Sequence, residues 1–352
     1  MKLNIKKKNI FLAGANDAFR QLVSFSTFGI SSKPQRVDIR INHKCNLRCG
    51  HCLQRHEGEE LVTEDWKAVI MDLKKWLGCF PLVITGGEPL LRQDLFEIIY
   101  FSFNLGLVTM LNTNGSLINS EVADKLERSG LDIIALSLDG FQEKTHDSLR
   151  GPGAYANTMG AIAELKGRIR TQINTVITGQ NLAELLDLIE FSERNGLGIS
   201  FQGLICKGYD GKNISALADN GLFPQDKDRI SREFDRIIER KKKSPYIRSS
   251  TRYLLALKSY YLGLSSPILE CRAYDKAVTI LPDGAVKICW LSDPIGNISS
   301  TAIDDIWRSE ETRLKRKEMR KCKSDCSFLS CFFRENNFEK IQRYVNTFFI
   351  KT

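Results

Sequence analysis

Short runs with strand character alternate with amphipathic stretches between residues 37 and 204. The predicted strands are Val37–Ile41, Leu82–Thr85, Leu107–Asn112, Ile133–Leu138, Thr171–Ile177 and Gly198–Leu204. The apolar spacing between them predicts helices at Thr63–Leu77, Leu91–Asn104, Asn119–Ser129, Ala154–Lys166 and Leu182–Asn195, the last of them capped by Asn181. Six strands that alternate with helices predict an α/β fold, namely a partial (β/α)6 TIM-like barrel over residues 37–209.

The remaining chain divides into four segments. Residues 1–36 form an N-terminal extension in which Phe11, Ala15, Phe19 and Leu22 recur at helical spacing. This spacing predicts a helix that packs on the barrel, and a peripheral membrane contact is the alternative. Residues 210–262 form a helical bridge, residues 263–335 a small C-terminal domain, and residues 336–352 a helix or tail.

Composition and charge restrict the function classes. The chain has 352 residues, of which 42% are hydrophobic and 26% charged, as in an ordinary globular protein. Ten cysteines without a recognisable signal peptide indicate a reducing, cytoplasmic compartment in which thiols bind metals. Asparagines and glycines interrupt the uncharged run at 98–120, which excludes a transmembrane helix there. The net charge of +9 is spread over helical faces that also carry acids, and no nucleic-acid motif accompanies it, so an anionic substrate is the minority interpretation.

Three cysteines fall within eight positions, at Cys45, Cys49 and Cys52. Three thiolates hold a four-iron cluster at three corners and leave the fourth iron open for a ligand. Zinc is the alternative, with His43, His51 or His56 as the fourth ligand. The spacing C-x3-C-x-(aromatic)-C, with His51 at the aromatic position, resembles the signature of the radical SAM (S-adenosylmethionine) superfamily.

This resemblance implies a SAM site at the carboxyl ends of the strands, where parallel barrels place their chemistry. The cysteines would hold a [4Fe-4S] cluster, and SAM would chelate its open iron. The paired glycines of the Gly-Gly-Glu-Pro motif are expected to let the backbone approach the ligand closely. In the family, the motif's Glu accepts hydrogen bonds from the SAM ammonium, while a serine and an arginine contact the carboxylate or ribose. The expected cofactor-binding residues are His51, Gly86, Gly87, Glu88, Pro89, Asn112, Ser137, Asp139, Arg150 and Gln202. Asp139 could instead only cap a turn.

Five further cysteines lie in the C-terminal region. The run from Cys271 through Gly284 to Cys289 resembles the opening of SPASM and Twitch domains, and residues 278–289 predict a hairpin with a Pro-Asp-Gly turn. Five cysteines can close one auxiliary [4Fe-4S] cluster, so we expect Cys271, Cys289 and two of Cys322, Cys326 and Cys331 as ligands. A zinc knuckle is the alternative.

Two cysteines belong to neither set. Cys79 is expected to pack in the core. Cys206 follows the sixth strand near the barrel rim, where a thiol donates hydrogen to a substrate radical in several epimerases of the superfamily. An inert buried thiol is the other interpretation.

The resemblance implies an enzyme that reductively cleaves SAM to a 5′-deoxyadenosyl radical and takes hydrogen from a substrate. A flavodoxin- or ferredoxin-type protein would supply the electron. The first hypothesis is modification of a small molecule, such as a sugar, aminoglycoside, lipid or tetrapyrrole precursor, by dehydrogenation, epimerisation or a related reaction. The second is a ribosomal-peptide maturase, which residues 1–36 disfavour because they are too few for a winged-helix recognition module. The third is a non-catalytic iron–sulfur electron-transfer protein.

Overall fold

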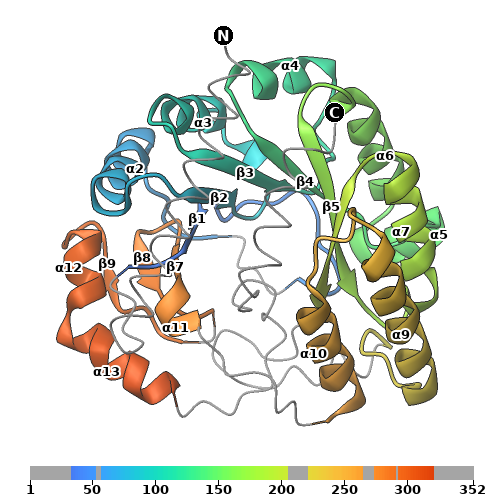
Figure 1. Ribbon diagram of the computed structural model, residues 1–352. Helices are drawn as coiled ribbons and strands as arrows, with labels where there is room; N and C mark the ends of the chain where they lie inside the picture. Colours follow the sequence, from blue (N-terminus) through green and yellow to red (C-terminus); the bar gives the residue numbers. More distant parts are fainter. Residues whose placement is uncertain (1–32, 53–56, 205–220, 265–272, 291, 321–352) are drawn as a thin grey trace.

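The computed structural model describes residues 33–52, 57–204, 221–264, 273–290 and 292–320, and these contain one curved sheet (Figure 1). The strand order is β6-β5-β4-β3-β2-β1-β7-β8-β9. The strands are β1 (Arg36–Arg40), β2 (Pro81–Thr85), β3 (Val108–Thr113), β4 (Ile133–Ser137), β5 (Arg170–Ile177), β6 (Gly198–Gly203), β7 (Ala277–Ile280), β8 (Ala285–Lys287) and β9 (Gly296–Asn297). The six predicted barrel strands are confirmed as parallel neighbours.

Helices cover the outer side of the curved sheet (Figure 1). They are α2 (Thr63–Leu77), α3 (Leu95–Asn104), α4 (Ser120–Arg128), α5 (Glu143–Arg150), α6 (Ala154–Leu165) and α7 (Leu185–Arg194), with the 3-10 turns η1 (Pro89–Leu91) and η2 (Leu182–Glu184). The single helix predicted from Leu91 is therefore a turn followed by α3. Helix α5 was not predicted, because most of its residues are polar. Only His146, Leu149 and Arg150, which lie on one side of the helix, are buried.

Alternation along β1 separates the two faces of the sheet. Val37, Ile39 and Ile41 are fully buried and belong to the hydrophobic core between sheet and helices. Asp38 and Arg40 point to the opposite, inner face because successive strand residues face opposite sides. Strand β5 has the same two-residue period: its inner-face residues are half-buried and its core-facing residues are buried. Half-buried inner residues on this parallel strand indicate that, within the described part of the chain, no second layer packs against this face.

The C-terminal hairpin extends the barrel sheet. Strand β7 pairs in parallel with β1, with Val37 opposite Val278, and β8 returns antiparallel to β7. The predicted Pro-Asp-Gly turn is confirmed between them, and Gly284 there has φ +84°, a left-handed conformation that favours glycine. Helices α11 (Ala273–Lys276), α12 (Ile303–Arg308) and α13 (Glu310–Met319) accompany this hairpin.

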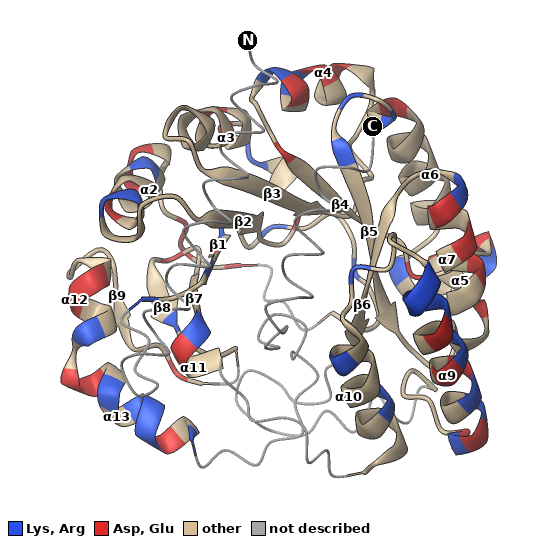
Figure 2. Ribbon diagram, in the orientation of Figure 1, with Lys and Arg blue, Asp and Glu red and all other residues tan. Residues whose placement is uncertain are grey.

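Two helices pack at the β6 end of the sheet, α9 (Lys227–Lys243) and α10 (Thr251–Leu262). The Tyr261 hydroxyl donates to the Ile177 carbonyl at 2.7 Å and accepts from the Leu204 amide at 2.8 Å, which ties α10 to β5 and β6. Lys and Arg alternate with Asp and Glu on α9 and α13 (Figure 2), which supports the interpretation of the positive charge as solvated helical faces. None of the described helices is long and apolar enough to cross a membrane.

Candidate SAM and cluster site

The cysteine loop follows β1 directly. Cys45 and Cys49 are half-buried, Cys52 is exposed, and none of the three is in a disulfide. A turn closed by the Cys52 amide and the Cys49 carbonyl, at 3.0 Å, folds the loop on itself. Burial raises the pKa of the Cys45 and Cys49 thiols, whereas the Leu47 amide at Cys45 and the Arg150 cation at Cys49 oppose that rise.

The glycine pair is required by a contact within the protein. A Cβ on Gly86 would lie 2.1 Å from Asn42 Oδ1, and one on Gly87 would lie 2.2 Å from the Lys44 carbonyl oxygen. The Gly87 amide donates to the Asn42 carbonyl at 3.0 Å, so the loop after β2 runs directly against the loop after β1. The close approach that this structure shows at the two glycines is to the Asn42 side chain and the Lys44 backbone of the loop after β1, and close approach to a ligand stays a prediction.

Glu88 ties the β2 loop to the end of β3. Its carboxylate is almost fully buried and accepts from Thr113 Oγ1 at 2.7 Å and from the Leu90 and Asn114 amides at 3.1 and 2.8 Å. Burial raises the pKa of Glu88, and these three donors oppose the rise. Oε2 accepts only the Asn114 amide among these bonds, so it keeps capacity for a further donor such as an ammonium group.

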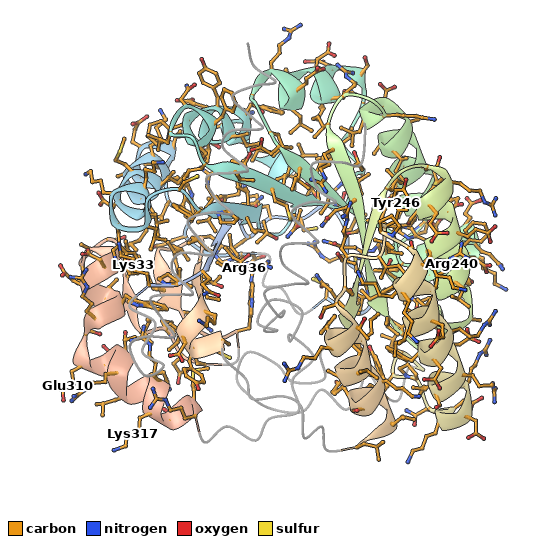
Figure 3. All side chains as sticks on the ribbon, viewed as in Figure 1. Lys33, Arg36, Arg240, Tyr246, Glu310 and Lys317 are labelled. Carbon is orange, nitrogen blue, oxygen red and sulfur yellow. The ribbon has the colours of Figure 1, made fainter. Side chains whose placement is uncertain are left out.

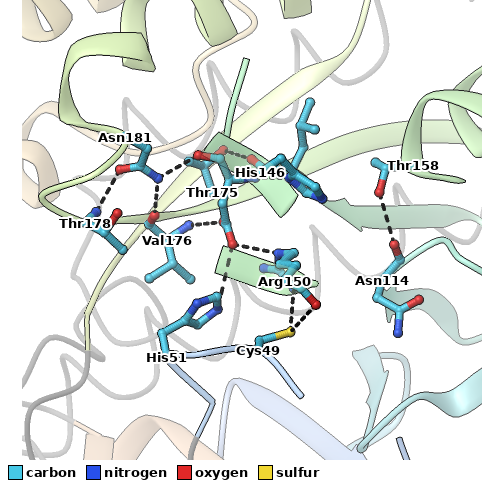
Figure 4. Close-up of polar contacts among 12 residues, drawn as sticks. Cys49, His51, Asn114, His146, Arg150, Thr158, Thr175, Val176, Thr178 and Asn181 are labelled. Carbon is cyan, nitrogen blue, oxygen red and sulfur yellow. Dashed lines mark hydrogen bonds and ion pairs between the residues drawn. The ribbon is translucent and has the colours of Figure 1, made fainter. Parts of the chain in front are cut away.

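Asp139 and Arg150 form a buried ion pair behind the cysteine loop (Figure 4). Arg150 Nε donates to Asp139 Oδ2 at 2.6 Å, and Asp139 Oδ1 accepts the Val176 amide at 2.8 Å. Arg150 Nη1 also lies 4.0 Å from Cys49 Sγ. Arg150, predicted as a ligand contact, is therefore already anchored by protein groups and stands beside a predicted cluster ligand.

Two histidines flank this ion pair, of which His146 is fully buried and His51 is half-buried. His51 Nε2 lies 3.7 Å from Asp139 Oδ2, and His146 Nδ1 accepts the Asp139 amide at 3.0 Å. Burial lowers the pKa of each histidine to about 4, so both are neutral at pH 7. His51 was predicted to bind the cofactor, whereas His146 was predicted only as a possible cap of a turn or helix. Its contact with Asp139 arises because it lies on the buried side of α5, a helix that was not predicted.

Asn181 does not cap the following helix as predicted. Its side-chain amide donates to the Asp139 and Val176 carbonyls, both at 2.7 Å, and its Oδ1 accepts the Thr178 amide at 2.8 Å. It therefore fixes the loop after β4 to the end of β5 and supports the position of Asp139.

The other predicted contacts lie on the inner face of the sheet. Ser137 is opposite Asn174, and Gln202 is opposite Val176, the inner-face residue two positions beyond Asn174 on β5. Asn112 is opposite Ala135, also on this face, and its Oδ1 is buried without a hydrogen-bond partner in the described part of the chain. The sequence analysis missed Gln172 and Asn174, which the two-residue alternation of β5 could have identified.

Of the predicted auxiliary ligands, only Cys289 lies within the described residues, where it is half-buried. Cys271, Cys322, Cys326 and Cys331 lie outside them, as does Cys206. The Arg40 guanidinium lies 5.0 Å from the ring centre of Trp290, the residue after Cys289. Strand β1 leads to the cysteine loop. Through Arg40 it also contacts Trp290, which adjoins the predicted auxiliary ligand Cys289. Cys79 donates to the Gly106 carbonyl at 3.1 Å, away from both sets.

The donor set fits an iron–sulfur cluster and SAM. Three free thiols share one loop, and Asn112 offers an orphaned buried acceptor on the inner face. Among the described residues, no three His, Cys, Asp or Glu side chains converge closely enough to hold a single metal ion. A four-iron cluster does not need such convergence, because each thiolate binds a separate iron.

Comparisons with known proteins identify both parts of the chain. Residues 39–192 match the radical SAM superfamily, and residues 271–331 match SPASM, an iron–sulfur cluster-binding domain. A radical SAM domain uses SAM and a [4Fe-4S] cluster, and a SPASM domain binds auxiliary iron–sulfur clusters.

Relatives with established names are enzymes. The chain is 34% identical to the AdoMet-dependent heme synthase of Methanosarcina barkeri over 173 residues, 47% of this chain and 49% of that one. It is 32% identical to the PqqA peptide cyclase of Bradyrhizobium diazoefficiens over 182 residues, 49% of this chain and 46% of that one. Each alignment thus spans about half of the relative. The fold is similar to that of Streptococcus suis SuiB bound to precursor peptide SuiA, with TM-score 0.67 and 18% identity over 89% of this chain and 74% of that one.

Proposed function

We propose that this chain, which belongs to the radical SAM superfamily and carries a C-terminal SPASM domain, abstracts hydrogen from a small molecule of the tetrapyrrole class. The similarity to a heme synthase supports this choice among the small-molecule substrates. The observation that carries it is the polar inner face of the sheet, which adjoins the cysteine loop and includes Asn112, Ser137 and Gln202.

In this proposal Cys45, Cys49 and Cys52 would hold the cluster, and a flavodoxin- or ferredoxin-type protein would supply the electron. When bound, the cluster and SAM supply a 5′-deoxyadenosyl radical, which is reactive enough to take hydrogen from an unactivated carbon. The protein's task is to orient the reacting groups and exclude other hydrogen donors.

Fixed polar groups perform the orientation. Glu88 Oε2, which accepts the Asn114 amide, would accept the SAM ammonium in its remaining position, and the unpartnered Asn112 Oδ1 would accept a donor of the ligand. The Asp139–Arg150 pair holds the guanidinium beside Cys49, where it offsets the negative charge of the thiolate. Ser137 and Gln202 face the same interior and contact the cofactor.

The test uses anaerobically reconstituted protein with SAM, a chemical reductant and coproporphyrin III or its iron complex. We expect 5′-deoxyadenosine to form in proportion to a porphyrin product of lower mass, detected by mass spectrometry. A Cys45→Ala variant provides the matched control, because it retains the inner face but lacks one cluster ligand. Formation of 5′-deoxyadenosine at the same slow rate with and without porphyrin would reject the substrate proposal.

A peptide maturase is the second candidate, and the similarity to a peptide cyclase favours it. A short peptide encoded beside this gene, incubated under the same conditions, would show a mass loss of two hydrogens if it were crosslinked. That result, with no porphyrin product, would replace the first proposal by the second.

The outcome of the reaction depends on whether Cys206 returns hydrogen to the substrate. If it does, Cys206→Ala still forms 5′-deoxyadenosine but no inverted product, and wild-type protein in heavy water places one deuterium on the product carbon. Normal turnover of Cys206→Ala without deuterium incorporation would favour oxidation through the auxiliary cluster.

A further inference from the structure

One guanidinium of the site contacts a predicted cluster ligand. Arg150 ends α5, and its Nη1 lies 4.0 Å from Cys49 Sγ (Figure 4). Arg150 is 9% exposed, and Cys49 is half-buried. Because burial keeps water away from both groups, the positive charge of Arg150 acts on Cys49 with less screening than it would at the surface.

Hydrogen bonds on both sides fix this contact. Arg150 Nε donates to Asp139 Oδ2 at 2.6 Å, and Asp139 is itself fully buried. On the other side, the Gly50 amide donates to the Leu149 carbonyl at 3.0 Å, which joins the cysteine loop to the last turn of α5. The guanidinium is therefore held beside Cys49 by the surrounding structure.

Arginine suits this position because its guanidinium has more than one bonding edge. The planar group binds Asp139 through Nε while Nη1 faces the sulfur of Cys49. A lysine ammonium is a single point of charge on a flexible stem, so it does not combine the two contacts in one fixed geometry.

The charges near Cys49 do not cancel. Burial raises the pKa of the Cys49 thiol, Arg150 lowers it, and Asp139 raises it by less than Arg150 lowers it. The Arg150 carbonyl oxygen lies 3.9 Å from Cys49 Sγ, but a carbonyl cannot donate to a thiolate. The guanidinium is therefore the part of Arg150 that compensates negative charge on the sulfur.

Negative charge near this sulfur increases when the cluster is reduced. In that step one electron passes from a flavodoxin- or ferredoxin-type protein to the cluster, and no bond forms or breaks. The net charge of an iron–sulfur cluster, the hydrogen bonds to its sulfurs and its exposure to solvent set its reduction potential. A fixed cation beside one sulfur favours the form that carries the additional electron.

We propose that Arg150 raises the reduction potential of the SAM-binding cluster by holding positive charge beside the Cys49 sulfur, and that Asp139 is the positioning residue of this guanidinium. This role differs from the contact with the SAM carboxylate or ribose that the family resemblance implies. It goes beyond the proposed function and does not depend on the substrate, because the electron is taken up before any substrate reacts.

The experiment measures the reduction potential directly, in the absence of SAM. Full-length, anaerobically reconstituted protein is poised at a series of potentials, and each sample is frozen and examined by electron paramagnetic resonance. The variant with Ala in place of Cys45, Cys49 and Cys52 should retain only the auxiliary signal, so its spectrum identifies the signal of the SAM-binding cluster. Arg150→Gln removes the charge beside Cys49, and Arg150→Lys keeps it.

Arg240→Gln is the matched control. Arg240 also pairs with a carboxylate, that of Glu193, but it lies on α9 at the outer side of the molecule (Figure 3). Arg150→Gln and Arg240→Gln each remove one positive charge from the protein. A difference between their potentials therefore reports the position of the charge and not the net charge of the protein.

We expect Arg150→Gln to lower the equilibrium constant for one-electron reduction about 10-fold, which corresponds to a fall of about 59 mV in the midpoint potential. Arg150→Lys should show a smaller fall, because the ammonium keeps the charge without the fixed geometry. The control should keep the wild-type value. The midpoint potential is a property of the molecules that hold the cluster, so a partial loss of folded protein weakens the signal without moving its midpoint.

The double variant Asp139→Asn, Arg150→Gln gives a second measurement if Arg150→Gln takes up too little iron. It removes the whole ion pair and so leaves neither charge buried without its partner. Its potential should also fall, though by less, because the effect of Arg150 on Cys49 outweighs that of Asp139.

A potential that is unchanged or higher in Arg150→Gln and in the double variant would overturn the inference. An equal shift of the auxiliary signal would do the same, because it would indicate a general change in the protein. If SAM binds more weakly to Arg150→Gln while the SAM-free potential stays at the wild-type value, Arg150 serves the ligand, and the inference is wrong.

Discussion

Arg150 and Asp139 form a 2.6 Å ion pair in which both side chains are at most 10% exposed, and the same guanidinium stands 4.0 Å from Cys49 Sγ. The pair therefore joins the end of α5 and the loop after β4 to the cysteine loop. Because Asp139 also accepts the Val176 amide, three segments depend on one carboxylate.

Asp139→Asn should lower the free energy of unfolding by about 3–5 kcal/mol, because Arg150 then becomes a buried charge without its main partner. The double variant Asp139→Asn, Arg150→Gln should recover part of this loss, since both charges are removed. Urea unfolding of the reduced protein measures both. A double variant that is as unstable as the sum of the single variants would show that the two residues act independently.

Gly87→Ala should prevent correct folding, because its Cβ would lie 2.2 Å from a backbone oxygen that cannot move aside. Gly160→Ala is the matched control. Gly160 lies inside α6 with no atom within 4 Å of an added Cβ, so this change should stabilise the protein by about 0.5–1 kcal/mol. Thermal unfolding of the two variants in parallel checks the prediction, and a stable Gly87→Ala protein would contradict the close contact between loops.

Glu88→Ala should weaken SAM binding and also reduce stability, because the change removes an acceptor from Thr113, Leu90 and Asn114. Thr113 is buried, so leaving its hydroxyl unsatisfied costs about 1–3 kcal/mol, and the half-buried Leu90 and Asn114 amides cost less. Calorimetric titration with SAM and urea unfolding separate the two effects. Reduced stability with unchanged SAM affinity would make Glu88 a purely structural residue.

The reconstituted protein should hold about eight irons, from two four-iron clusters. Replacing Cys45, Cys49 and Cys52 together by Ala should remove about half of the iron and abolish SAM cleavage. Iron analysis and chromatography of 5′-deoxyadenosine provide the measurements. About four irons with zinc in the C-terminal part would instead indicate a zinc site there.

Stability should fall as the pH drops from about 6.5 to about 4. Burial lowers the pKa of His146 to about 4 in the folded protein, whereas an unfolded histidine has its ordinary value near 6.5. The unfolded chain therefore binds the proton first, and the full stability is present only above that ordinary value. In His146→Gln, the free energy of unfolding should change less across this pH range, by up to about 3 kcal/mol. An unchanged pH profile would mean that the pKa of His146 is the same in the folded and the unfolded protein.

The sequence predicted the barrel well because strand periodicity and helical spacing are local properties. Strand β1, for example, is evident from the alternation of the apolar Val37 and Ile39 with the polar Asp38 and Arg40. The close contact of Gly86 and Gly87 with residues 42–44 could not be predicted, since the two segments are more than 40 positions apart in the sequence. Asn181 was misassigned for the same reason, because its partners at Asp139 and Val176 meet it only in the folded sheet.

The positions of Arg40 and Lys287 show the limit of local sequence patterns more clearly. Arg40 and Lys287 are separated by almost 250 positions, and nothing in either local sequence indicates that they share a face. Their proximity arises from the parallel pairing of β1 with β7, a long-range register that no local pattern encodes.

The position of β1 between β2 and β7 has a consequence for how this protein can be shortened. A chain that ends before residue 277 would leave β1 as an open edge, with a row of unpaired backbone groups that invites pairing with another molecule. The barrel thus depends on the C-terminal hairpin for its solubility as well as for any iron that the hairpin helps to hold. Deletions that aim to isolate the SAM-cleaving part should therefore keep the hairpin and remove residues only beyond β9.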